Sequence, residues 1–227
     1  MAVMRIVCLA NSRKLSGRCV AGKVVGSGAW LRPVSDRFHE EVSWHERHYQ
    51  DGGDPQVLDV IDVPLRHPKP NQHQAENWVL DSRYYWVRQG RVGWCDVASL
   101  VDQTPTLWPI GQSSYNGEND RIALSVAQQQ KGSLYFISVD SLVVKVFAPG
   151  EYFGEPKRRV QGRFTYNGTR YKLWITDPTI EKAYLAKSNG EYSMSKCHLT
   201  VSLGEPHNDG FVYKLIAAVI TTDVASG

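Results

Sequence analysis

Residues 5–37 read RIVCLANSRKLSGRCVAGKVVGSGAWLRPVSDR. Three apolar segments, residues 6–10, 19–25 and 29–34, alternate here with polar connections that contain glycine. This pattern is typical of short β-strands joined by exposed loops. The stretch holds seven lysines and arginines against one acid, whereas the whole chain holds 26 against 23. Such concentrated positive charge favours binding of nucleic acid or phosphate, although a solvated surface without a partner fits the composition equally well.

Length and composition describe an ordinary folded protein. With 227 residues, 42% hydrophobic and 22% charged, the chain can form one large or two small domains. No apolar run approaches the ~20 residues that cross a bilayer, and the first apolar segment is too short for a secretory signal. The four cysteines are scattered and form no CxxC pair. We therefore expect a cytoplasmic protein with reduced thiols and no membrane association.

Further along the chain, strand patterns surround short helical ones in both halves. In the first half, Asp36 is expected to cap a short helix with Phe38 and Val42 on its inner face. In the second half, Asn167-Gly168 predicts a hairpin turn, and Asp177-Pro178 predicts the start of a helix. The remaining strands are predicted at residues 57–65, 78–94, 133–148, 158–166, 169–176, 198–203 and 211–222.

Three strands, a short helix and two further strands make up each half, which is the order of a five-stranded OB barrel. The sequence therefore predicts an all-β fold with short helices, built as two tandem five-stranded OB-like barrels. We place the barrels at residues 1–104 and 120–227. Residues 105–119 are expected to form the linker because they are rich in proline and glycine.

Six motifs strengthen this interpretation: CLANSRK, GRCVAG and WLRPVS near the start, and YKLWITDP, CHLTVSLGEP and YKLIAAVI near the end. In this order they resemble the prokaryotic dual OB-containing domain family, over about residues 6–220. The resemblance implies two tandem OB-like barrels. It also implies a role in recognition of nucleic acid or nucleotides.

Two groups of residues in the first half are candidates for contacts with nucleic acid. The first group follows the first predicted strand and comprises Asn11, Ser12, Arg13, Lys14 and Arg18. It can cradle a phosphate. Alternatively, it is a hairpin loop whose basic side chains are solvated. The second combines a ring with guanidinium groups, as single-strand binders do, and comprises Trp30, Arg32 and Arg37. Trp30 and Arg32 lie two positions apart and so share a strand face. The alternative is that Trp30 lies in the core and Arg32 at its edge.

In the second half, Lys172 and Trp174 share one strand face, with Tyr171 and Leu173 on the other. This face can hold a strand of nucleic acid, or Trp174 packs against the neighbouring barrel.

Two acids, Asp177 and Glu205, are candidates for ligand contacts. The simpler role of Asp177 is a helix cap, and that of Glu205 is a turn residue. The His-rich segment HERH at residues 45–48 lacks the spacing of the HExxH metal motif, and no phosphate-binding lysine loop is present. We therefore predict no catalytic residue, no metal site and no cofactor.

Three functions follow as hypotheses. The first is a non-catalytic nucleic-acid-binding protein, with single strands among its candidate ligands, that uses basic and aromatic barrel faces. The alternative is a sensor or enzyme acting on a small nucleotide or modified base bound between the two barrels. A third hypothesis is a protein-interaction module of a larger bacterial system, with residues 38–49 as its surface.

Overall fold

The computed structural model of the protein describes residues 2–226. The chain divides into two units. The first unit comprises residues 2–101, 131–133 and 222–226, and the second comprises residues 102–130 and 134–221. Within residues 2–226, no helix combines the length and the apolar character needed to span a bilayer.

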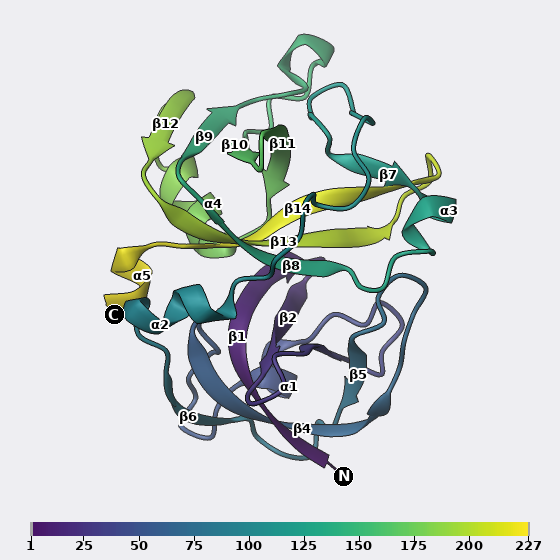
Figure 1. Ribbon diagram of the computed structural model, residues 1–227, viewed down its shortest axis with the longest axis vertical. Helices are drawn as coiled ribbons and strands as arrows, with labels where there is room; N and C mark the ends of the chain where they lie inside the picture. The colour runs from purple at the N-terminus through teal and green to yellow at the C-terminus, as the bar shows by residue number, and fades with distance from the viewer. Residues whose placement is uncertain (1, 227) are drawn as a thin grey trace. The chain divides into compact units, whose positions relative to one another are not determined.

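The first unit is a closed five-stranded barrel (Figure 1). Its strands follow the order β1-β2-β3-β5-β4, and β4 returns to pair with β1. All neighbours are antiparallel except β3 and β5, which are parallel. The elements are β1 (Ala2–Lys14), β2 (Gly17–Val24), β3 (Trp30–Val34), α1 (Trp44–Arg47), β4 (Asp59–Pro68), β5 (Asn77–Leu80), β6 (Val87–Arg91), α2 (Trp94–Val97), η1 (Ala98–Leu100) and α5 (Thr222–Ser226).

The second unit repeats this plan with one interruption. Its sheet follows the order β12-β9-β10-β11-β14-β13-β8, and β11 and β14 are the parallel pair. β8 pairs with β13 and continues through residues 140–141 into β9, which pairs with β10. Together β8 and β9 therefore occupy the place of β1, whose two halves pair with β4 and β2.

The elements of the second unit are β7 (Arg121–Ala123), α3 (Leu124–Ala127), β8 (Leu134–Val139), β9 (Leu142–Phe147), η2 (Glu151–Phe153), β10 (Arg159–Tyr166), β11 (Thr169–Ile175), α4 (Pro178–Leu185), β12 (Gly190–Met194), β13 (Cys197–Pro206) and β14 (Phe211–Ile220). The predicted fold class, two OB-like barrels with short helices, is confirmed.

The helix α1 begins later than the sequence pattern predicts. Ser43, not Asp36, is its N-cap, and a carboxylate oxygen of Glu46 accepts a 2.9 Å hydrogen bond from the backbone N–H of Ser43. This reciprocal capping box satisfies backbone N–H donors at the start of α1. Asp36 lies seven positions before Ser43, too far from the first turn to act as its cap. Phe38 is 93% exposed and so does not face the core, and Asp36 forms an ion pair with Arg66 instead.

Residues 105–119, predicted as the linker, lie in the second unit. Leu107 and Trp108 are buried in its core, and the backbone N–H of Leu107 donates a 3.1 Å hydrogen bond to the hydroxyl of Tyr171. Proline and glycine in this segment reflect the lack of regular secondary structure, which does not prevent the segment from packing on the barrel.

Candidate nucleic-acid interface

The outward face of β9, β10 and β11 in the second unit is rich in cations and rings. Alternation along these strands turns Val144, Val160, Tyr171 and Leu173 into the core. The intervening residues point away from the core and are exposed or half-buried: Val143, Lys145, Phe147, Arg159, Arg163, Thr165, Arg170, Lys172 and Trp174. We call this surface the β9–β11 face.

Strand register orders this face into rows. In one row, Arg163 is paired with Lys172 of β11 and with Val143 of β9. In the next row, Gln161 is paired with Trp174 and with Lys145. Positions in neighbouring rows are two residues apart along a strand, which corresponds to roughly 6.6 Å.

Two rings and one guanidinium group form a continuous platform at one end of the face. The rings of Phe147 and Trp174 are stacked, with centroids 5.8 Å apart and planes inclined by 16°. Arg159 lies over Trp174, with 4.1 Å between the guanidinium carbon and the ring centroid. Rings backed by guanidinium groups are the elements on which unpaired bases stack.

Acids neutralise only part of the positive charge. Arg163 forms a 3.0 Å ion pair with Glu191 of β12, and Arg170 forms a 3.0 Å ion pair with Glu118. All four side chains are substantially solvent-exposed, so these pairs are weak. Within residues 2–226, the Nζ atom of Lys172 has no hydrogen-bond or ion-pair partner.

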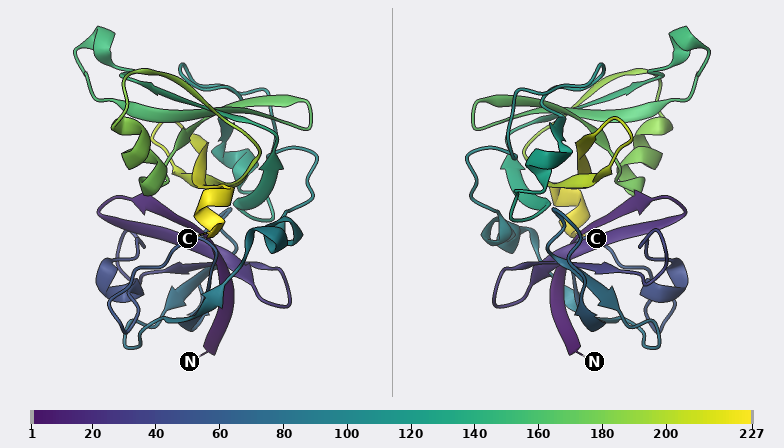
Figure 2. Two further views of the ribbon diagram at one scale, coloured as in Figure 1. Left: turned by 90° about the vertical axis from the view of Figure 1, so that its left-hand side faces the viewer. Right: turned by 90° about the vertical axis from the view of Figure 1, so that its right-hand side faces the viewer.

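The loop between β9 and β10 adds two further rings. Its short helix η2 projects beyond the sheet of the second unit (Figure 2). Tyr152 and Phe153 on this helix are 93% and 72% exposed, and their rings meet edge to face. In OB folds the loop after the first strand borders the binding face, so these rings lie in a position suited to contact a ligand.

The structure brings together only two of the residues predicted as nucleic-acid contacts on this face. Lys172 and Trp174 lie side by side along β11, on the side opposite Tyr171 and Leu173, as the alternation predicts. Sequence analysis missed Lys145 and Phe147. Their signal was the alternation of β9, but the neighbours of each residue depend on register, which a single sequence does not give.

Arg32 lies in the interior of the first unit. Its Nη2 is 3.0 Å from a carboxylate oxygen of Glu76, and both side chains are at most 5% exposed. Nη2 also donates a 2.8 Å hydrogen bond to Ser133, and Nη1 donates one of 3.3 Å to Asn77. This arrangement argues against the predicted contact between Arg32 and nucleic acid, because the guanidinium group does not reach the surface.

Trp30 is half-buried and is paired across the strands with Lys23. The Nζ atom of Lys23 lies 5.6 Å from the centroid of the Trp30 ring and donates a 2.6 Å hydrogen bond to the carbonyl of Leu100. Arg37 is exposed but binds Glu46 at 3.0 Å and the carbonyl of Glu41 at 2.7 Å. The structure therefore separates Trp30, Arg32 and Arg37 into different environments.

The residues of the predicted phosphate cradle lie on both sides of the turn between β1 and β2. Arg13 and Arg18 are directly paired across the two strands, with Arg13 exposed and Lys14 half-buried. Asn11 donates a 2.7 Å hydrogen bond to the carbonyl of Pro55, and Ser12 is buried. Phosphate binding by this group stays a prediction, with Arg13, Lys14 and Arg18 as the residues able to reach a ligand.

Asp177 has the structural role that its sequence context predicts. Its carboxylate accepts hydrogen bonds from the backbone N–H groups of Thr179, Ile180 and Val219. Burial raises the pKa of Asp177, while these three hydrogen bonds act in the opposite direction. Glu205 is exposed near the end of β13, and a contact between either acid and a ligand stays a prediction.

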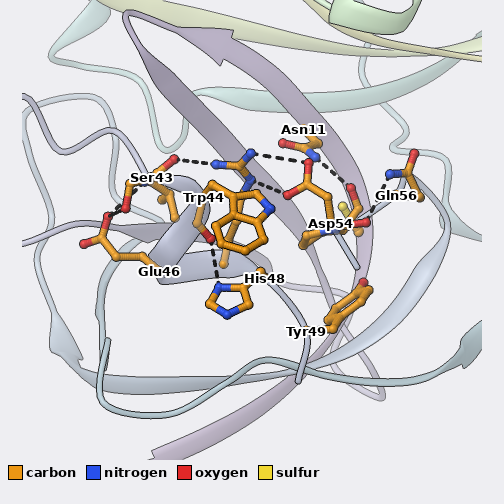
Figure 3. A network of polar contacts seen from close by, with 12 residues as sticks. Asn11, Ser43, Trp44, Glu46, His48, Tyr49, Asp54 and Gln56 are labelled. Carbon is orange, nitrogen blue, oxygen red and sulfur yellow. Dashed lines mark hydrogen bonds and ion pairs between the residues drawn. The ribbon is translucent and has the colours of Figure 1, made fainter. Parts of the chain in front are cut away.

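Residues 38–49, the predicted protein-interaction surface, contain α1, and Figure 3 shows the cluster of polar and aromatic side chains at this helix. The rings of Trp44 and His48 are stacked with centroids 4.3 Å apart, and Tyr85 meets His48 edge to face. Arg47 is buried and forms a 2.7 Å ion pair with Asp54. A protein partner for this cluster stays a prediction.

A sequence profile of the dual OB-containing domain matches residues 4–219. The chain belongs to the dual OB-containing domain family. Comparison with curated proteins and with solved structures gives no significant match. Membership in the dual OB family accounts for both barrels and is consistent with ligand binding on an OB face.

Proposed function

We propose that this dual OB protein binds single-stranded nucleic acid through its β9–β11 face and does so without catalysing a reaction. The observation that carries the proposal is the Phe147–Trp174 stack beside Lys172, whose ammonium group has no partner within residues 2–226. Rings offer stacking surfaces to bases, and unpaired cations attract phosphates. Both are needed for binding that tolerates different sequences.

The shape of the face favours an extended polymer over a small nucleotide. The depression on the face has a volume of only about 50 Å³. Pockets that enclose small ligands have volumes of roughly 300–1,000 Å³. A nucleotide bound here would therefore remain largely exposed, whereas a polymer gains affinity from several contacts along its length.

Two substitutions separate the contributions of stacking and charge. We expect Trp174→Ala to weaken binding of an oligothymidylate about 10-fold without changing the salt dependence, because a base loses about 1–3 kcal/mol of stacking. Lys172→Gln is expected to weaken binding severalfold and to reduce the slope of log K against log salt by about 0.7. Fluorescence anisotropy between about 50 and 200 mM salt measures both effects.

Matched controls for these variants lie elsewhere on the chain. Lys182→Gln removes an equal charge from the exposed side of α4, and Phe38→Ala removes an exposed ring from the first unit. Both controls are expected to bind as the parent does. Absence of binding by the parent at about 50 mM salt, or binding that does not depend on salt, would contradict the proposed function.

A further inference from the structure

The depression on the β9–β11 face is surrounded by positive charge. It is lined by Val143, Lys145, Gln161, Arg163, Lys172 and Glu191. Three of these six residues are cations, and one is an acid. Gln161 is only 2% exposed, and its Nε2 donates a 2.7 Å hydrogen bond to the carbonyl of Asn116, which fixes this side chain in place.

The cations of this depression are arranged unfavourably for a protein without an anionic ligand. Arg163 and Lys172 are directly opposite each other on β10 and β11. Like charges in this position repel each other and destabilise the strand pair. Glu191 compensates Arg163 from the other side at 3.0 Å, but Lys172 has no such partner within residues 2–226.

We infer that this depression is a phosphate subsite, in which Lys172 and Arg163 hold one backbone phosphate of the bound strand. The inference rests on the proposed function. A phosphate between the two cations removes their repulsion and gives the ammonium group of Lys172 a charge-assisted hydrogen bond. Trp174 lies two residues further along β11, roughly 6.6 Å away, so a base next to this phosphate reaches the ring platform.

Glu191 competes with the phosphate for Arg163. Its carboxylate now holds the guanidinium group that the phosphate is to bind, and its negative charge lies at the edge of the same depression. Glu191 lies on β12, an edge strand that, among the described residues, pairs with β9 alone in the sheet. Glu191 therefore lowers the affinity of the subsite for every phosphate ester.

Removing this competing charge is expected to strengthen binding. Glu191→Gln is expected to raise the affinity for an oligothymidylate of about four nucleotides by roughly 3-fold at low salt. It is also expected to steepen the salt dependence, since Arg163 becomes available to phosphate. Glu181→Gln removes an equal charge from α4 and is expected to change neither quantity.

Neutral linkages in the ligand locate the phosphate. Each phosphate of the same short oligothymidylate is replaced in turn by an uncharged methylphosphonate, and the affinity is measured for the parent and for Lys172→Gln. We expect one linkage at which the replacement lowers the affinity of the parent about 5-fold and leaves the affinity of Lys172→Gln almost unchanged. Such coupling is the result expected when that phosphate and Lys172 contact each other.

The outcomes separate this inference from the proposed function. If the parent binds with a normal salt dependence but no linkage couples to Lys172 and Glu191→Gln binds as the parent does, the phosphate subsite is refuted and the proposed function stands. If the parent does not bind the oligonucleotide at about 50 mM salt, both are refuted. Coupling at one linkage together with tighter binding by Glu191→Gln supports both.

Discussion

Replacing Arg32 by Met is expected to lower the free energy of unfolding of the first unit by about 3–5 kcal/mol. The side chains of Arg32 and Glu76 are 4% and 5% exposed, and the guanidinium group also binds Asn77 and Ser133. Without Arg32, the carboxylate of Glu76 stays buried with no opposite charge, which costs much more than the pair itself contributes. Hydrogen exchange of β3 and β5 amides in urea measures the effect on this unit separately from the second.

Arg5→Met provides the matched control. Arg5 and Asp62 also form two short hydrogen bonds, at 2.7 and 2.8 Å, but Arg5 is half exposed. Solvent screens this pair, so its loss is expected to cost much less stability than the loss of Arg32. The double variant Arg32→Met/Glu76→Leu is expected to recover much of the lost stability because it removes both charges.

Equal losses for Arg32→Met and Arg5→Met would refute the view that burial makes the Arg32–Glu76 pair critical. The same variants also test the predicted role of Arg32 in binding. If Arg32 acts only inside the fold, Arg32→Met keeps the salt dependence of oligonucleotide binding at temperatures where the protein remains folded.

Local sequence patterns explain which parts of the structure could be predicted. The hairpin at Asn167-Gly168 and the helix cap at Asp177 depend on residues close in sequence, and both appear as expected. Lys172 and Trp174 lie on one face for the same reason, because alternation along a strand is a local property. The order of strands and helix then limited the fold to OB barrels.

Long-range pairing explains what the sequence could not predict. Glu76 is 44 positions from Arg32 and Ser133 is 101 positions away, and no local pattern indicates that these residues meet. Likewise, Phe147 and Arg159 reach Trp174 only through the register of β9, β10 and β11. Local alternation therefore predicts which face of a strand a polar residue occupies. The residues that meet it from distant parts of the chain decide whether that face is buried or exposed to a ligand.

Raising the pH from about 8 to 10.5 is expected to stabilise the second unit through Lys214 by about 3 kcal/mol. Lys214 is only 1% exposed, and its Nζ donates a 2.9 Å hydrogen bond to the carbonyl of Pro109. Burial lowers the pKa of Lys214 from 10.5 to about 8, while the charge of Asp120 acts in the opposite direction. Between these two values the unfolded chain binds more protons than the folded protein, so the free energy of unfolding rises with pH.

The comparison of the parent with Lys214→Met isolates this effect. Burial raises the pKa of the Cys197 thiol to about 12, which lowers the stability of the same unit as the pH rises above 9. Since Cys197 is present in both proteins, its contribution cancels in the difference between their free energies of unfolding. Over this pH range, we expect the free energy of unfolding of the parent to rise by about 3 kcal/mol relative to that of Lys214→Met. Lys182→Met, on the exposed side of α4, is expected to show the same pH dependence as the parent. Parallel curves for the parent and Lys214→Met would mean that the folded protein accommodates the charged ammonium group as well as water does.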